Sequence, residues 1–505
     1  MKIQKKDIEA IGLFLGPIVS IIFYYIGFID DYKANSMAAI TLLMAIWWMT
    51  EAVPLSVTSM VPLLLFPFFE IHSANETANQ YINSTIFLFL GGFLLAQAME
   101  RWELHKRISL HIIKLLGGDA IGIIRGFYLS SWMLSMFITN TATTIMMLPI
   151  AIAVIKGLEG KFSDKVIRNF SVSLLLGIAY SSSLGGIATL VGTVPNIAFK
   201  SIFELSFPDA PEITFAKWMS FALPTSAILM TIIWFVLIKF LFKIDKDIKV
   251  DKQFINQEIK KLGKISIQET IVLYTMISAS LLWIFRSNVD LGFLIIPGWS
   301  NMLPDPSLID DSTVAIALSL VLFLIPATLK NLGIEFRLMT KETIVRIPWD
   351  ILLLFGGGFA MAKGFQSTGL SEIIGASFAD MQNVPPLLIV FFICIVIIFL
   401  TEFTSNTATT YTFLPILASI AVATNTNPMI LMIPATISAS LAFMLPVATP
   451  PNAIVFGTGK LQISEMANSG LWINIISAFL LPIIFYFIGY YVFDIDSNIF
   501  PTWAE

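Results

Sequence analysis

Two short polar motifs interrupt long apolar stretches of this chain and contain residue types that could bind ions. They are TNT at 139–141 and SNT at 405–407, and each is followed by a proline-containing break, GTVPN at 192–196 and ATPPN at 448–452. Interrupted helices present N-termini whose free N–H groups attract anions, while hydroxyl and unwound carbonyl oxygens coordinate hard cations such as Na+. The four motifs therefore predict adjacent sites for an anion and a cation.

These motifs belong to an internal repeat. Asn140 falls on Asn406 at an offset of 266 residues, and the same offset brings FLGGF at 89–93 onto FGGGF at 355–359. The two proline-containing breaks repeat at an offset of 256 residues. Three motifs that occur twice in the same order are typical of transporters built from two halves of inverted topology.

The composition indicates that lipid surrounds most of the chain. Its 505 residues are 56% hydrophobic and 13% charged, with a mean hydropathy of +0.83, more apolar than a soluble protein of this size. At about 20 apolar residues per crossing, the segments allow about ten to thirteen membrane passages. The formal net charge is −4, so the chain has no excess of Lys and Arg with which to bind a nucleic acid. One cysteine, Cys394, excludes an internal disulfide.

The positive charges predict the topology, because Lys and Arg accumulate in cytoplasmic loops. Most of the 30 Lys and Arg residues lie in five segments: 2–6, 101–125, 156–168, 239–264 and 330–346. The apolar stretch between the second and third of these must leave and return on one side of the membrane, as a re-entrant hairpin. A second hairpin, entered from outside, is expected within residues 364–459, which contain no Lys or Arg. The N-terminus is then expected inside and the C-terminus outside the cytoplasmic membrane.

The expected fold is an all-α polytopic membrane protein with about 11 transmembrane helices and two re-entrant helical hairpins in an inverted two-fold repeat. Its predicted parts are an N-terminal transmembrane helix at 1–36, a first repeat at 37–245 with a hairpin at 120–158 and a broken helix at 170–200, a cytoplasmic linker at 246–266, and a second repeat at 267–505 with a hairpin at 384–422 and a broken helix at 428–458.

The polar motifs also allow a simpler interpretation, in which Asn and Thr cap helix ends and the prolines merely kink helices. Two symmetric pairs of such elements argue against it, because unsatisfied backbone at membrane depth costs several kcal/mol per group unless it lines a cavity or binds something. No Arg or Lys occurs in any of the four motifs. An anion would be held there by hydroxyls, amides, backbone N–H groups and bound cations, an arrangement that permits its release.

The paired tips and breaks, together with FLFLGGFLLAQAMERW at 87–102 and LPVATPPNAIVFGTGK at 445–460, closely resemble the divalent anion/sodium symporter family. The resemblance extends over nearly the whole chain and is strongest to bacterial dicarboxylate transporters. It implies transport of di- and tricarboxylates such as succinate, malate and fumarate, usually with Na+. It also implies a homodimer in the lipid membrane and an elevator-like movement of a transport domain against a scaffold.

The resemblance assigns expected roles to individual residues of this chain. It implies a first Na+ site at Ser135, Thr139, Asn140 and Gly192, and a second at Thr401, Ser405, Asn406 and Ala448. It implies substrate contacts at Asn140, Thr141, Thr193, Asn406, Thr407, Thr449 and Pro450. The first half departs from the family pattern, because Thr139 stands where the family has Ser and Val194 where it has Pro. Thr139 keeps the hydroxyl but adds a methyl group, and Val194 restores a backbone N–H, so the first Na+ site differs from the family pattern in a way that also allows a cation-independent exchanger.

Glu402 is a carboxylate inside the predicted second hairpin, where an ionisable residue is a functional candidate for proton coupling. A structural hydrogen-bonding role is the favoured interpretation. The string GTGK at 457–460 fails the phosphate-loop pattern, and HExxH and GxSxG motifs are absent, so no catalytic constellation supports an enzyme.

The expected function is secondary active transport of a C4-dicarboxylate, coupled to Na+. The alternative within the same fold is a Na+-independent dicarboxylate exchanger. An ion channel that uses the tips as a filter and a membrane enzyme acting on lipid-like acids are the alternatives from other classes.

Overall fold

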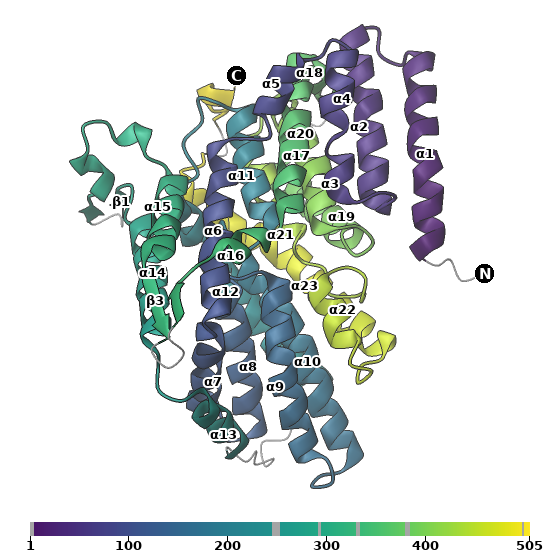
Figure 1. Cartoon of the computed structure of the whole chain (residues 1–505). Coiled ribbons are helices and arrows are strands. Elements are labelled where there is room, and N and C mark those ends of the chain that lie inside the picture. The colour runs from purple at the N-terminus through teal and green to yellow at the C-terminus, as the bar shows by residue number, and fades with distance from the viewer. Residues whose placement is uncertain are drawn as a thin grey trace.

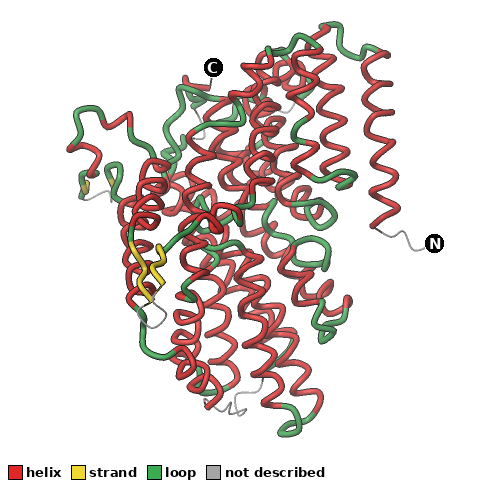
Figure 2. The backbone as a smooth tube through the Cα atoms, viewed as in Figure 1, coloured by secondary structure: helices red, strands yellow, loops and turns green. Residues whose placement is uncertain are grey.

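The computed structural model describes residues 5–244, 253–290, 294–329, 334–378, 384–496 and 499–504, which are mostly helical (Figures 1 and 2). The helices of the first half are α1 (Lys5–Ile26), α2 (Tyr32–Thr50), α3 (Leu55–Thr58), α4 (Val61–Phe68), α5 (Ala74–Asn79), α6 (Ser84–Arg101), α7 (Leu104–Leu116), α8 (Ala120–Leu134), α9 (Asn140–Leu158), α10 (Asp164–Ile187), α11 (Val194–Ser206) and α12 (Phe215–Phe235), which continues as a π-helix over Val236–Leu241.

The helices of the second half are α13 (Gln253–Leu262), α14 (Ile267–Ile284), α15 (Asp311–Leu324), α16 (Lys341–Val345), α17 (Trp349–Ser367), α18 (Leu370–Ala376), α19 (Pro386–Leu400), α20 (Asn406–Ala423), α21 (Pro428–Ser438), α22 (Pro450–Phe456), α23 (Ile463–Ile484) and α24 (Tyr490–Val492), with a π-helix at Phe485–Gly489. Of the predicted linker at 246–266, residues 246–252 lie outside the described residues, and α13 occupies 253–262.

The all-α fold class is confirmed, with two small exceptions. β1 (Val289–Asp290) pairs with β2 (Ile295–Ile296), and β3 (Pro326–Leu329) pairs with β4 (Ile334–Arg337), both antiparallel. In the second ribbon, Pro326 lies opposite Arg337. Both are two-stranded and lie at the side of the helical body (Figure 2).

The helices begin where the sequence offers side-chain caps. The Asn83 side chain accepts from the Ile86 N–H at the start of α6, and Asp119 accepts from the Gly122 N–H at the start of α8. At the start of α14, Ser266 and Glu269 form a capping box. These side chains satisfy the N–H groups that the first turn of a helix leaves without partners.

The distribution of apolar residues is that of a multi-pass membrane protein. Within the described residues, seven helical segments are long and apolar enough to cross a membrane: Lys6–Ile26, Ala74–Arg101, Asn140–Leu158, Asp164–Ile187, Phe215–Leu241, Ile267–Ile284 and Ile463–Val492. Large apolar side chains lie on the surface, among them Phe14 (67% exposed) and Leu64 (70% exposed). Such exposure is favourable in lipid, where surface side chains are apolar and helices satisfy their own backbone groups.

Paired helices flank the polar motifs. α8 and α9 are joined by residues 135–139, and α19 and α20 by residues 401–405. α10 and α11 are separated by an unwound stretch at 188–193, and α21 and α22 by one at 439–449. In Figure 1, α16, α21 and α22 lie near mid-height of the molecule, whereas α7 and α13 lie at one end and α5 and α18 at the other.

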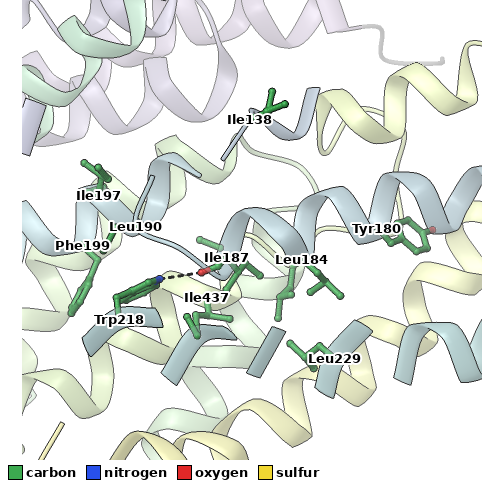
Figure 3. Packing of buried hydrophobic residues seen from close by; sticks show 14 of the residues in the cluster. Ile138, Tyr180, Leu184, Ile187, Leu190, Ile197, Phe199, Trp218, Leu229 and Ile437 are labelled. Carbon is green, nitrogen blue, oxygen red and sulfur yellow. Dashed lines mark hydrogen bonds between the residues drawn. The ribbon is translucent and has the colours of Figure 1, made fainter. Parts of the chain in front are cut away.

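The apolar window of α10 is entirely buried. α12 is fastened to its unwound end, because Trp218 Nε1 donates to the Ile187 carbonyl at 3.0 Å and Ser226 Oγ donates to the Leu184 carbonyl at 2.5 Å. Figure 3 shows the Trp218 ring beside Ile187 among buried apolar side chains. α10, α11 and α12 therefore form one packed unit.

α6 and α15 pack at a small-residue crossing. A Cβ added to Gly91 of α6 would lie 2.5 Å from the Ala315 Cβ and 2.8 Å from the Ala315 carbonyl carbon. Ser319 Oγ also approaches the Gly91 carbonyl, at 3.2 Å. The absence of a side chain at Gly91 therefore sets the distance between the two helices.

Gly91→Ala is expected to destabilise the protein by about 1–3 kcal/mol, because the added methyl group must push α15 away from α6. Thermal unfolding in detergent measures the effect. Gly157→Ala on α9 is the control, since nothing lies within 4 Å of a Cβ there. Equal melting temperatures for the two variants would contradict the close crossing.

Candidate functional site

The first polar tip closes the hairpin of α8 and α9. The Thr139 hydroxyl caps α9, and Ser135 Oγ donates to Asn140 Oδ1 at 2.6 Å. The Asn140 side chain lies against Gly186 of α10, where an added Cβ would come within 2.5 Å of Oδ1. The tip is therefore docked on the end of α10 through an amide oxygen.

The second tip, between α19 and α20, has the same geometry. Thr401 Oγ1 lies 2.8 Å from Asn406 Oδ1, and these two residues are related to Ser135 and Asn140 by the 266-residue offset. The Thr401 hydroxyl also lies 2.9 Å from the Ala439 carbonyl oxygen, which belongs to the unwound stretch after α21. In both tips, a buried hydroxyl holds the side-chain oxygen of the asparagine.

One buried side chain contacts carbonyl oxygens at the end of α10 and in the unwound stretch that follows it. Asn196 Nδ2 lies within hydrogen-bond distance of three carbonyl oxygens, those of Gly186 (3.0 Å), Ile187 (3.1 Å) and Thr189 (2.7 Å). Asn452 does the same for the longer stretch between α21 and α22, where its Nδ2 contacts the carbonyls of Ala442 and Leu445, both at 3.1 Å. Both asparagines are fully buried.

Sequence reasoning did not identify Asn196 and Asn452 as functional residues. Both had a detectable signal, because each follows a proline at the start of its helix and the two are related by the 256-residue repeat. Their role is to position the breaks, since an unwound carbonyl without a partner is costly away from water.

Glu402 binds the backbone of the second break through its carboxylate. Its carboxylate accepts from the backbone N–H groups of Phe443 (2.6 Å), Met444 (2.9 Å) and Leu445 (3.0 Å), and from Asn474 Nδ2 (2.6 Å). All four partners are donors, so the Glu402 side chain is the acceptor in each of these bonds. This geometry supports the favoured structural role over proton coupling.

The two halves differ at this point. The position related to Glu402 by the repeat is Met136, which has no acceptor in its side chain, and the first break is the shorter of the two. There, Thr189 Oγ1 donates to the Met136 carbonyl at 2.5 Å instead. In the longer second break, three consecutive backbone N–H groups, those of residues 443–445, converge on one position, and the Glu402 carboxylate accepts from all three.

A cavity of about 1050 Å³ lies where the tips and breaks meet. All but two of the residues that the sequence predicts for the two ion sites and the substrate site line this cavity. The lining residues are Thr139, Asn140, Thr141, Gly192, Thr193, Ser405, Asn406, Thr407, Ala448, Thr449 and Pro450. The exceptions are Ser135 and Thr401, which are fully buried and hold the asparagine side chains. Residues far apart in the sequence thus meet in one space.

Charged residues line the cavity only outside the tips and breaks. Glu51, Glu100 and Arg346 are the charged residues among those that line it, and none of them belongs to a tip or a break. α9, α11 and α20 begin at the cavity, so that their first-turn N–H groups and dipoles favour an anion there. Hydroxyl and amide oxygens beside those helix ends favour a hard cation.

The donor set fits Na+ rather than a transition metal. Only oxygen ligands are available at the two tips, and Oδ1 of Asn196 and Oδ1 of Asn452 are buried acceptors that receive no hydrogen bond within the described part of the chain. Among the described residues, no group of three His, Cys, Asp or Glu could hold a metal ion. The expected coupling ion is therefore compatible with the chemistry of the tips.

Glu402→Gln is expected to lower the free energy of unfolding by about 3 kcal/mol, because the amide replaces one acceptor oxygen with an NH2 group that faces backbone N–H donors. Thermal unfolding in detergent measures the loss. Glutamine resembles a protonated glutamic acid, so an unchanged melting temperature would indicate a neutral carboxyl group and would restore the proton-coupling hypothesis.

Comparison with known proteins agrees with this site. The family described as sodium:sulfate symporter transmembrane region matches residues 18–493. The sodium-dependent dicarboxylate transporter SdcS of Staphylococcus saprophyticus is 41% identical over 97% of this chain and 93% of its own length. SdcS of Staphylococcus aureus strain NCTC 8325 is 41% identical over 98% of this chain and 94% of its own length.

Two solved structures share the fold at low sequence identity. Neisseria gonorrhoeae MtrF matches with a TM-score of 0.54 and 12% identity over 92% of this chain and 97% of that one. The Alcanivorax borkumensis YdaH transporter matches with a TM-score of 0.54 and 12% identity over 90% of this chain and 99% of that one. The family match and the SdcS relatives confirm the resemblance found in the sequence. The chain is therefore a membrane transporter rather than an enzyme, and it belongs to the sodium:sulfate symporter family.

Proposed function

We propose that this chain is a secondary active transporter that moves a C4-dicarboxylate, of the succinate, malate and fumarate class, together with Na+ across the cell membrane. The carrying observation is the cavity in which polar tips and helix breaks from both halves meet without any Arg or Lys among them. The names of the SdcS relatives support both the dicarboxylate and the sodium ion.

The two carboxylates of the substrate would bind at opposite sides of the cavity. One carboxylate would meet Asn140, Thr141 and Thr193, and the other would meet Asn406, Thr407 and Thr449, beside Pro450. The N-termini of α9, α11 and α20 add N–H groups and positive dipole ends to this site. Two matched sets of donors suit a ligand with an acidic group at each end.

Two Na+ sites would lie directly behind the substrate. The first would use Ser135, Thr139, Asn140 and Gly192, and the second Thr401, Ser405, Asn406 and Ala448. The asparagines are common to both kinds of site, so bound Na+ would orient their side chains for the dianion. Shared ligands make each species raise the affinity for the other, which couples the ion gradient to substrate transport.

The site would move as one body, in an elevator mechanism. Contacts between the halves support this: Tyr180 of α10 donates to the Phe443 carbonyl of the second break at 2.7 Å. α22 packs on α9 and α10, and α11 packs on α20 and α21. Because the cavity floor belongs to a single interlocked unit, alternating access requires that unit to move against the other helices.

The glycine motifs suit the boundary of such a unit. A Cβ at Gly92 of α6 would touch Val191 of the first break at 3.3 Å, and one at Gly358 of α17 would lie 1.9 Å from the Tyr411 ring of α20. In each half the repeated glycine motif brings a scaffold helix close to the moving unit. We further propose a homodimer held by scaffold helices, with the N-terminus inside and the C-terminus outside the cell.

Uptake of labelled succinate into proteoliposomes, with or without an inward Na+ gradient and with empty or preloaded vesicles, separates coupled transport from exchange. Empty vesicles with the Na+ gradient are expected to accumulate succinate, because the ions supply both the driving force and the ordering of the tips. Uptake that ignores Na+ and needs preloading would identify an exchanger instead. Single-channel currents without saturation would identify a channel.

Alanine at Asn140 or Asn406 is expected to abolish Na+-dependent uptake, because each change removes an oxygen shared by ion and substrate. Na+ is expected to raise the melting temperature of the unmodified protein, since a ligand that binds only the folded state stabilises it, and this shift should shrink in both variants. Asn301→Ala, at an exposed asparagine outside the cavity wall, is the control. Normal uptake by either cavity variant would refute the assigned site.

A further inference from the structure

A cluster of charged residues, with a buried Lys200, Arg286 and Asp311 and an exposed Glu212, lies between the first broken helix and the helices that flank it. Arg286, which follows α14 and is 4% exposed, donates to Asp311 Oδ1 (2.7 Å), to Glu212 Oε1 (2.6 Å) and to the Ile309 carbonyl (2.8 Å). Asp311, the first residue of α15, is 1% exposed. Its partners therefore hold a charge that is almost completely removed from solvent.

Lys200 joins this cluster from α11. It is 6% exposed, and its Nζ lies 2.6 Å from Glu204, 3.7 Å from Glu212 and 3.0 Å from the Ile213 carbonyl. Lys200 stands on the helix that begins at the cavity with Val194. We call Lys200, Glu204, Glu212, Arg286 and Asp311 the ion-pair cluster.

The cluster joins the proposed moving unit to the proposed scaffold. Lys200, Glu204 and Glu212 belong to α11 and the loop after it, and α12 follows that loop and is bonded to α10. Arg286 and Asp311 flank the loop between α14 and α15, and α15 packs along α6. The Arg286–Glu212 pair therefore crosses the boundary.

Two more contacts cross the boundary at the same place. The backbone N–H of Phe215, the first residue of α12, donates to Asp311 Oδ2 at 2.8 Å. The Phe215 ring stacks on Trp283 of α14, with centroids 4.8 Å apart and planes at 25°. All of these contacts need the present register of α12 against α14 and α15.

The cavity extends toward segments rich in Lys and Arg. Its wall reaches Glu100 and Arg346, which adjoin the basic segments at 101–125 and 330–346. Those segments are the ones expected in the cytoplasm. The cluster is therefore closed in a conformation whose cavity reaches toward the basic loops.

We propose that the ion-pair cluster is a lock between the moving unit and the scaffold, which holds the transporter open to the side of the basic loops. This inference rests on the proposed elevator function. Opening to the other side shifts α11 and α12 against α14 and α15, so the Arg286–Glu212 pair and the Phe215–Asp311 bond must break. Arg286 is buried, so a register that separates it from Glu212 leaves its charge paired with Asp311 alone.

Accessibility of a cysteine in the cavity tests the lock. Ile145 of α9 lines the cavity and is 55% exposed, and the only native cysteine, Cys394, is fully buried. Ile145→Cys is labelled with a membrane-impermeant maleimide in inside-out and right-side-out vesicles. Adding Glu212→Gln should raise the labelling rate from the outside several-fold and lower it from the inside. Lysine lacks the planar guanidinium group with which Arg286 binds both Asp311 and Glu212, so Arg286→Lys should shift the labelling rates in the same direction.

Asp494→Asn is the matched control, because it neutralises a carboxylate that pairs with Lys217 of α12 at 3.2 Å without involving α14 or α15. It should leave both labelling rates unchanged. A Glu212→Gln protein that transports succinate and labels like its parent would overturn the lock. The proposed function is judged separately, by Na+-driven uptake into vesicles that contain the unmodified chain: its absence would refute symport whatever the labelling rates are.

Discussion

The backbone of the helix breaks must be hydrogen-bonded inside the protein, and the rest of the site depends on that requirement. Unwound backbone at membrane depth has no water to bind, so each exposed group is costly. Asn196 satisfies carbonyls of the first break, while Asn452 and Glu402 satisfy carbonyls and N–H groups of the second. With these groups satisfied from behind, the remaining polar groups of the breaks and tips can face the cavity.

This arrangement explains how a site without permanent positive charge can still favour an anion. The helices α9, α11 and α20 direct their N-termini at one cavity, and hydroxyl and amide oxygens lie beside them. In the proposed cycle the missing charge comes from Na+, which leaves with the substrate. A fixed arginine in the same place would retain the dicarboxylate after the ions had gone.

Buried ions appear in two different settings in this fold. Glu402 binds backbone donors within one unit, so its contacts can persist while that unit moves. In the ion-pair cluster, by contrast, the Arg286–Glu212 pair and the Phe215–Asp311 bond join two units, so these two contacts must break if those units shift. A buried pair contributes little net stability but is strongly penalised when separated, which makes it better suited to selecting one arrangement than to strengthening the fold.

The sequence by itself determined the membrane class, the helical fold, the repeat and the family, because these depend on composition, periodicity and local motifs. It also predicted the cavity residues Asn140 and Asn406, since their motifs recur with one offset. Only the tertiary structure decided that both tips open into one cavity, that Ser135 and Thr401 lie behind it, and that Glu402 binds three backbone N–H groups. Those facts depend on contacts between residues separated by dozens to hundreds of positions, and the chain order does not specify such contacts until the helices pack.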